Sequence, residues 1–436
     1  MVVNMHSRMS LQCGEYFRVL PLLVLGFATY QIDRTNISSA LTGGFASDIG
    51  VNQNTINLGN QLMFLGVIVL EIPSNMVLQR VGPRRWISTQ VFIFGIIATL
   101  QIFIRNRTGF LLTRAILGLA EAGYIPAAMY TLSTWYTKDE LTKRIAIFFF
   151  GMFGGSAVAP LLGAGLLKLD GRGGMLGWQW IFLLEGCWSI LVSIPLFTLL
   201  PEHTPQKAPT HAEEEGSKPS PQWNESHSTP LPLSTIYKTL TNYTKYPHFL
   251  ATACVFSTWS PLTTYTPSII MSLGFSRIDA NALAAIGNLL TLPVILFFAW
   301  VSDRTRQRGL TVMFAIACYL IALVLLRCLQ PNVGKWGRFG LWTTVNGLAV
   351  GYHPIHNAWI QVNCGSAGER SVIVMSATAG LMAGTQIFRH DDSEDGYPRG
   401  LLIMIILVLS GLVLTLVQSV IYRVLNRSKG SVPQEI

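Results

Sequence analysis

The chain has 436 residues, of which 50% are hydrophobic and only 12% are charged, and its formal net charge is +9. Soluble domains carry about 25% charged residues, which cover their water-facing surfaces. With about half of that complement, the composition excludes an ordinary soluble enzyme, a disordered chain and a nucleic-acid-binding protein. It predicts instead an all-α protein that lies mostly inside a lipid bilayer.

Twelve apolar runs are long enough to cross a bilayer, which takes about 20 mostly apolar residues in a helix. The first six predicted spans are 19–41, 56–79, 86–104, 109–134, 145–167 and 178–200. The second six are 248–272, 280–301, 309–328, 338–361, 371–388 and 400–422. Polar residues interrupt the first, fourth, tenth and eleventh spans, so these four carry the weakest signals.

One long polar stretch separates the two groups of six spans. Residues 201–247 are rich in Pro, Ser and Glu, a composition typical of a flexible linker. The sequence therefore predicts a cytoplasmic N-terminus (1–18), a six-helix half (19–200), a cytoplasmic linker (201–247), a second six-helix half (248–422) and a cytoplasmic C-terminus (423–436).

Positive charge gathers in alternate loops. If both termini are cytoplasmic, the cytoplasmic segments hold most of the 31 Lys and Arg residues. This bias follows the positive-inside rule and predicts that orientation. It also accounts for the net positive charge without a nucleic-acid partner.

Two basic turns occupy corresponding positions in the two halves, as repeated six-helix units would produce. SNMVLQRVGPRRW follows the second span, and AWVSDRTRQRG follows the eighth. At these residues the sequence resembles the major facilitator superfamily, whose signature after the second span is a glycine, an aspartate and a basic cluster. The first turn keeps Arg80, Gly82, Arg84 and Arg85 but has Gln79 at the acidic position, whereas the second keeps Asp303 and Arg304 without the glycine.

Four further stretches resemble the fungal anion:cation symporter branch, which includes allantoate-, nicotinate-, pantothenate- and tartrate-type permeases. They are DRTNISSA (33–40), EIPSNMVLQRVGPRRW (71–86), RAILGLAEAGYIPAAMYTLSTWY (114–136) and GWQWIFLLEG (177–186). The resemblance implies the major facilitator fold, with 12 transmembrane helices in two halves that close alternately on a central site. It also implies a secondary transporter of a small organic anion, coupled to protons.

Chemistry of other kinds has no support in the sequence. There is no nucleotide-binding P-loop, which makes an ATP-driven pump improbable, and no clustered catalytic groups are evident. We therefore expect no enzymatic activity, no cofactor and no metal. The expected partners are a small-molecule substrate, protons and the lipid bilayer, and the expected state is a monomer in the plasma membrane, with the vacuole or another endomembrane as the alternative.

Ionisable residues inside the predicted spans are functional candidates, because each costs at least about 2.5–3.5 kcal/mol to insert. Those of the first half are Asp33, Arg34, Glu71, Arg114, Glu121 and Glu185. Arg114 and Glu121 are seven residues apart, which places them on nearly the same helix face, about 10 Å apart along the axis.

We predict that Arg34 and Arg114 bind a carboxylate substrate, because a guanidinium can donate two parallel hydrogen bonds to a carboxylate. The resemblance supports Arg34, since a first-span arginine at the matching position is implicated in substrate binding in anion-carrying relatives. Glu121 is predicted to take up and release protons, and Asp33, Glu71 and Glu185 are predicted to serve proton coupling or gating. The alternative for each residue is a structural ion pair or helix contact.

The second half offers fewer candidates. His353 and His356 flank Pro354 in the tenth span, and His353 is predicted to serve proton coupling or gating; a structural, hydrogen-bonded histidine is the alternative. Trp259 and Tyr265 are predicted to line the substrate site, with packing or interfacial roles as the alternative.

The fifth span supports a second functional interpretation. Gly151, Gly155, Ala159 and Gly163 recur every fourth residue and form a smooth face for helix contact. GSAVAPLLGA (155–164), with Pro160 as a kink, resembles the superfamily's antiporter motif. The alternative function is thus a proton-antiport exporter of a fungal secondary metabolite. A non-transporting nutrient sensor is a third possibility, although such sensors usually carry a long cytoplasmic tail and only residues 423–436 follow the last span.

Overall fold

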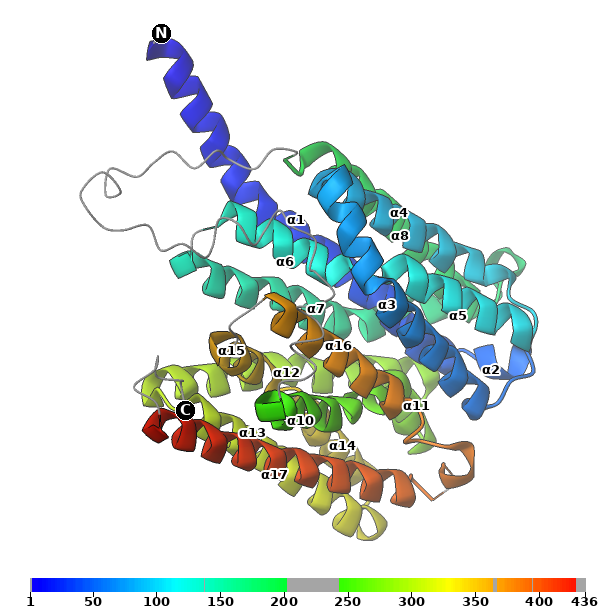
Figure 1. The fold of residues 1–436 in the computed structure, drawn as a ribbon. Coiled ribbons are helices and arrows are strands. Elements are labelled where there is room, and N and C mark those ends of the chain that lie inside the picture. Colours follow the sequence, from blue (N-terminus) through cyan, green and yellow to red (C-terminus); the bar gives the residue numbers. More distant parts are fainter. Residues whose placement is uncertain (1, 137, 202–242, 364–366, 394, 429–436) are drawn as a thin grey trace.

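The computed structural model describes residues 2–136, 138–201, 243–363, 367–393 and 395–428. Within these ranges the chain forms α-helices (α) and short 3-10 turns (η) and no β-strand, so the predicted all-α class is confirmed. Figure 1 shows two groups of helices lying one over the other, α1–α8 and α10–α17. Most of the predicted linker (202–242) and the end of the predicted C-terminus (429–436) lie outside the described residues.

The elements of the first half are α1 (Val2–Thr42), α2 (Phe45–Asp48), α3 (Gln53–Val81), α4 (Pro83–Leu100), η1 (Gln101–Phe103), α5 (Arg107–Glu121), α6 (Tyr124–Trp135), α7 (Lys138–Leu166), η2 (Leu167–Leu169), η3 (Arg172–Gly174) and α8 (Gly177–Leu199). The elements of the second half are η4 (Tyr243–Lys245), α10 (Tyr246–Ser257), α11 (Trp259–Ser272), α12 (Arg277–Thr305), α13 (Arg308–Leu329), η5 (Gln330–Asn332), α14 (Lys335–Leu348), α15 (His353–Asn363), α16 (Ala367–Gly384), η6 (His390–Asp392) and α17 (Pro398–Ser428).

Each predicted span coincides with one long helix or with two helices in series. The fourth span is α5 followed by α6, the seventh is α10 followed by α11, and the tenth is α14 followed by α15. Seven helical spans in the described part of the chain are long and apolar enough to cross a membrane, and an eighth is if the bent pair Gln53–Glu71 and Pro73–Val81 counts as one. Breaks interrupt the seventh and tenth spans, and the first buries polar side chains such as Gln31 and Asp33.

The outer surface of the bundle is apolar. Phe103, Trp300 and Leu191 are 67%, 63% and 58% exposed, and many other large apolar side chains lie on the surface with them. A soluble protein rarely leaves so much apolar surface in contact with water. These side chains therefore face lipid.

Local sequence signals set several helix ends. The side chains of Asn52, Asn106 and Ser276 accept backbone N–H groups at the starts of α3, α5 and α12. Gly82 has φ +90°, a conformation that suits glycine, and Pro83 begins α4 directly after it. The glycine of the signature turn is thus required by the backbone that reverses α3 into α4.

The break in the fourth span positions an acidic side chain. Gly123 has φ +84°, and a Cβ at this position would overlap the Ser74 side chain, so α5 ends at Glu121 and α6 begins at Tyr124. The Glu121 carboxylate therefore lies at a bend near the middle of the span.

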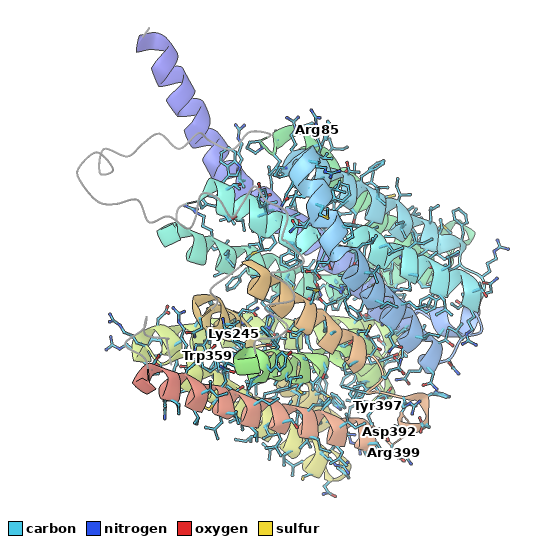
Figure 2. The ribbon with its side chains drawn as sticks, viewed as in Figure 1. Arg85, Lys245, Trp359, Asp392, Tyr397 and Arg399 are labelled. Atoms are coloured by element: carbon cyan, nitrogen blue, oxygen red, sulfur yellow. The ribbon has the colours of Figure 1, made fainter. Side chains whose placement is uncertain are left out.

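The bundle has two ends. We call the end where α8 and α17 finish and α10 begins the terminal end, and the end where α1 finishes and α3 begins the distal end. Figure 2 shows Lys245 and Trp359 at the terminal end of the second half and Asp392, Tyr397 and Arg399 at its distal end.

Candidate functional site

A cavity of about 130 Å³ lies between the two halves. Its wall on the first half consists of Gln31, Arg34, Thr35, Ile37, Asn60, Met63, Phe64, Ile125, Met129, Phe149 and Met152. Its wall on the second half consists of Phe256, Trp259, Ser260, Thr263, Thr264, His353, Asn357, Ala377, Thr378 and Leu381. Both halves thus contribute, as a site that two rocking halves enclose requires.

Arg34 is the only formally charged residue among the described side chains that line the cavity. Its Nη1 donates to the Tyr30 hydroxyl at 2.8 Å, and its guanidinium lies 4.6 Å from the centre of the Phe64 ring. Its Nε and Nη2 have no hydrogen-bond acceptor among the described residues. The side chain is therefore held in place with two buried donor groups that lack a hydrogen-bond partner within the described residues.

Glu121 is the acidic partner of Arg34. Its Oε2 lies 3.9 Å from the Arg34 Nε, a distance that allows an ion pair but no direct hydrogen bond. The Glu121 side chain is fully buried, and neither carboxylate oxygen has a hydrogen-bond donor in the described part of the chain. The pair is thus close enough to interact and loose enough to be separated by a ligand or a proton.

Arg114 is also fully buried but does not line the cavity. Its Nη1 lies 3.7 Å from the Sδ of Met63, which does line it, and its guanidinium lies 5.7 Å from the centre of the Phe110 ring. Nε and Nη2 have no acceptor among the described residues. In this conformation Met63 separates Arg114 from the cavity, so Arg34 is the arginine that the structure presents to a ligand.

Asp33 and Glu185 lie inside the first half. Ser189, one turn after Glu185 on α8, donates to the Asp33 carboxylate on α1. Both carboxylates are buried, and neither belongs to the cavity wall. Their position joins α1 to α8 behind the cavity.

Glu71 lies at the bend of α3. It is buried, and its Oε2 has no donor among the described residues. The following turn carries Ser74, which accepts from the Trp86 indole at 3.1 Å and from Gln90 at 3.3 Å. Ser74 thus joins α3 to α4, and Glu71 lies one turn before it, outside the cavity wall.

The structure separates the two predicted aromatic residues of the second half. Trp259 lines the cavity, whereas Tyr265 does not and instead donates to the side-chain oxygen of Asn57 across the two halves. The two histidines also differ. His353 lines the cavity, whereas His356 pairs with His248 at 3.1 Å between ring nitrogens, beside Thr252.

Hydrogen bonds join the two halves on the distal side of the cavity. Asn57 donates to the Phe388 carbonyl at 2.7 Å, Asn281 donates to Thr42 at 2.6 Å, and Asn60 donates to Thr264 at 3.4 Å. Sequence reasoning missed these residues, although the polar cluster NQNTINLGNQ at 52–61 was a visible signal. They close the distal end.

An ion pair at the distal surface adds to this contact. Arg277, at the start of α12, donates to Asp170 of the first half at 2.8 Å. The Asp170 carboxylate also accepts the Gly177 N–H at 2.7 Å. The Arg277 hydrogen bond, with the Gly177 N–H, holds the pKa of Asp170 below its usual value of 3.8.

The signature residues lie at the terminal end. Arg84 donates to the Phe197 carbonyl and lies over the Phe197 ring, which ties α4 to the end of α8. Arg80 and Arg85 are exposed, as are Asp303 and Arg304 of the second copy (Figure 2 shows Arg85). In this conformation the signature is a surface feature, well apart from the cavity.

The glycine stripe of the fifth span packs against the first. Cβ atoms at Gly151, Gly155 and Gly163 of α7 would meet Val24, Ala28 and Ser39 of α1 at sub-van-der-Waals distances. Pro160 lies on the same helix, beside Ser156 and Asn288. Close approach of α7 to α1 accounts for the spacing of the small residues.

Comparisons with known proteins agree with this architecture. The model of the Major Facilitator Superfamily matches residues 23–388. A putative tartrate transporter of Agrobacterium vitis is 26% identical over 426 residues, covering 92% of this chain and 89% of that protein. An uncharacterized transporter of Saccharomyces cerevisiae is 28% identical over 395 residues, covering 86% of this chain and 72% of that protein.

Solved structures show the same fold. A bacterial homologue of the human lysosomal transporter Spinster, in an inward-facing and unoccupied conformation, superposes with a TM-score of 0.67 at 18% identity, covering 96% of this chain and 99% of that chain. This fold has twelve transmembrane helices in two halves, in agreement with the twelve predicted spans. The chain is an integral membrane transporter that belongs to the Major Facilitator Superfamily.

Proposed function

We propose that the protein is a proton-coupled secondary transporter of a small organic anion that carries a carboxylate. The observation that supports this most strongly is Arg34, a cation in an otherwise uncharged cavity wall, with two donor groups that no described residue accepts. Among the relatives, the protein named as a putative tartrate transporter supports an organic anion as the class of cargo, and its own dicarboxylate is not carried over to this chain.

The anion would bind at Arg34. A guanidinium with two free N–H groups forms charge-assisted hydrogen bonds to a carboxylate, which are about twice as strong as neutral ones. Tyr30 and Phe64 hold the guanidinium in position, so little side-chain entropy is lost on binding. Arg114 would support the positive potential from behind Met63.

The proton would bind at Glu121. The Glu121 carboxylate and the incoming anion compete for the guanidinium of Arg34. Leaving either negative charge unpaired in the interior is costly. Protonation of Glu121 frees Arg34 for the anion, and departure of the anion returns Arg34 to Glu121. Each cycle would then carry one proton with one carboxylate. Asp33, Glu71 and Glu185 would act in gating, within the helix contacts where they lie.

Alternating access would require the two ends of the bundle to open and close in turn. The loop charges predict that the terminal end faces the cytoplasm. Since hydrogen bonds close the distal end, the structure would represent a state closed to the outside. Transport would require these bonds to break while the terminal ends come together. We place the protein in the plasma membrane as a monomer, with its central mechanism contained in one chain.

The exporter alternative receives less support from the structure. The small residues that resemble the antiporter motif are accounted for by contact between α7 and α1. Direction is nevertheless measurable, because vesicles with an imposed pH gradient show whether anion and proton move together or in opposition.

The test is uptake by proteoliposomes with inward-directed proton gradients, using radiolabelled tartrate, benzoate and 3-hydroxybenzoate. Arg34→Ala is expected to reduce uptake about 10- to 150-fold, because a hydrogen bond to a charged group contributes about 1.5–3 kcal/mol. Arg34→Lys is expected to give an uptake rate between those of Arg34→Ala and the wild type, since lysine keeps the positive charge but cannot form two parallel hydrogen bonds to a carboxylate. The control is Arg105→Ala, which removes an exposed arginine. Uptake by Arg34→Ala at the wild-type rate would overturn the proposal.

A further inference from the structure

The two walls of the cavity differ in charge. The wall on the first half contains Arg34, whereas the described residues on the opposite wall contain no formal charge. That second wall offers neutral hydrogen-bonding groups instead, among them Ser260, His353 and Asn357. A ligand that spans the cavity therefore meets a cation at one side and uncharged polar groups at the other.

His353 and Asn357 form a defined hydrogen-bonded pair on α15. The Asn357 amide nitrogen lies 2.9 Å from the His353 Nε2. An amide nitrogen only donates, so Nε2 accepts, and a neutral ring must then carry its hydrogen on Nδ1. The tautomer of His353 thus follows from its neighbour.

The Nδ1–H group of His353 has no acceptor among the described residues. The residue is only 5% exposed, so this donor is shielded from water. A buried donor without an acceptor costs about 1–3 kcal/mol, a cost that a hydrogen-bonding ligand would remove. Phe256 stacks on the imidazole at 4.2 Å between ring centres and 17° between planes, which fixes the ring's orientation.

Apolar and flat side chains surround the space between Arg34 and His353. Phe64 and Phe149 lie on one wall and Phe256 and Trp259 on the other. Three methionines, Met63, Met129 and Met152, complete the apolar lining. Aromatic and thioether groups favour a flat apolar body over a strongly hydrated one.

We propose that the cavity selects a monocarboxylate with a flat apolar body and one uncharged hydrogen-bonding group opposite the carboxylate. The carboxylate pairs with Arg34, and the uncharged group accepts from His353 Nδ1–H and donates to the side-chain oxygen of Asn357. This inference rests on the proposed function and narrows it. His353 and Asn357 are specificity-determining residues, and a second carboxylate is rejected because it would be desolvated at a wall without a cation.

The test is binding to the purified full-length protein, measured from the shift in its melting temperature with ligand concentration. The probes share one ring: benzoate, 3-hydroxybenzoate, benzene-1,3-dicarboxylate and 3-hydroxybenzamide. We expect 3-hydroxybenzoate to bind about three- to tenfold more tightly than benzoate, the gain of about one hydrogen bond. We expect the dicarboxylate to bind at least about tenfold more weakly than benzoate, and the amide to bind most weakly.

Two variants test the residues. His353→Phe keeps the ring stack and removes Nδ1–H, and Asn357→Ala removes the amide. Each is expected to lower the affinity for 3-hydroxybenzoate more than the affinity for benzoate, so that the ratio of the two affinities falls to about one. His390→Phe, the same substitution at an exposed histidine outside the cavity, is expected to preserve the wild-type preference.

The outcomes separate this inference from the proposed function. If carboxylates bind in an Arg34-dependent manner but the dicarboxylate binds as tightly as 3-hydroxybenzoate, the inference is overturned and the proposed function stands. Equal loss of benzoate and 3-hydroxybenzoate in both variants also overturns it. If no carboxylate binds, or if Arg34→Ala binds them as the wild type does, both proposals are overturned.

Discussion

The two halves of the molecule share one fold and differ in the charges that they bury. The described spans of the first half bury Asp33, Glu71, Arg114, Glu121 and Glu185, with Arg34 largely buried beside them. The second half buries three histidines, His248, His353 and His356, in its spans, with Lys245 at their edge. Since an ionisable group in a membrane interior is costly, the first half is where the chain retains charge. The difference suggests a division of labour, with anion and proton bound by the first half and ligand shape sensed by the second.

The largest expected effect comes from one substitution in each half. Glu121→Gln removes the proposed proton-binding group, so a pH gradient is expected to lose its ability to drive uptake. The wild type should accumulate the anion about tenfold per pH unit, because one unit corresponds to about 1.4 kcal/mol for each proton moved. Glu121→Gln should show no such accumulation while still exchanging internal for external anion.

The matched substitution in the second half is His353→Phe. It is expected to change ligand preference and to leave the pH gradient effective as a driving force. Accumulation ratios of both variants in proteoliposomes provide the measurement. Loss of gradient-driven uptake in His353→Phe, with Glu121→Gln unaffected, would reverse the assignment of the two halves.

Close helix contacts at glycines occur in both halves, in contrast to buried charge. A Cβ at Gly118 of α5 would overlap the Met63 carbonyl of α3, and a Cβ at Gly384 of α16 would overlap the Ser257 carbonyl of α10. These carbonyls belong to the backbone and cannot rotate away from the new methyl group as a side chain would. Gly118→Ala and Gly384→Ala should therefore each destabilise the protein by about 1–3 kcal/mol. Melting temperatures in detergent check this.

The control for both substitutions is Gly154→Ala on α7, where a Cβ meets nothing within 4 Å. That variant should melt at the wild-type temperature or slightly above, because alanine favours helix by up to about 1 kcal/mol. A wild-type melting temperature in Gly118→Ala or Gly384→Ala would show that the packing at that position does not require glycine.

The smallest expected effect concerns the ion pair that joins the two halves. Asp170→Asn should weaken distal closure and increase labelling of Ser38→Cys, a buried position one turn before Thr42 on α1, by a membrane-impermeant thiol reagent about two- to fivefold. The exchange Asp170→Arg with Arg277→Asp should restore the wild-type rate. The parent protein without Ser38→Cys gives the background.

The pH dependence of this effect follows from the lowered pKa of Asp170. A carboxylate with a depressed pKa contributes fully above its ordinary value of 3.8 and loses its contribution as the pH falls through the lowered one. The labelling difference between wild type and Asp170→Asn should therefore be constant from about pH 5.5 to 7.5. A difference that disappears within this range would contradict the ion pair.

The sequence predicted the twelve spans because bilayer burial demands long apolar runs whatever their contacts. It missed the break at Thr258, since both parts of the seventh span are apolar and no glycine marks the interruption. The break near Glu121 was equally unforeseen, because it depends on the contact between Gly123 and Ser74.

The candidate site was less predictable than the fold. Spacing placed Arg114 and Glu121 on one face of a helix, but only packing shows that Met63 lies between Arg114 and the cavity. Tyr265 was expected at the cavity and lies in the distal contact instead. Residue type identified the ionisable candidates, whereas the side that each one faces depends on helices far away in the sequence.

We propose that Arg34 and Glu121 couple one anion to one proton. The most direct measurement follows anion uptake and internal pH in the same proteoliposomes, at zero membrane potential, with the carboxylate that shows the largest Arg34-dependent uptake. Vesicles with Arg34→Ala supply the background of passive permeation. We expect internal acidification by about one proton per anion above that background, since a single carboxylate, Glu121, opposes Arg34. Arg34-dependent anion uptake without any proton movement would contradict it.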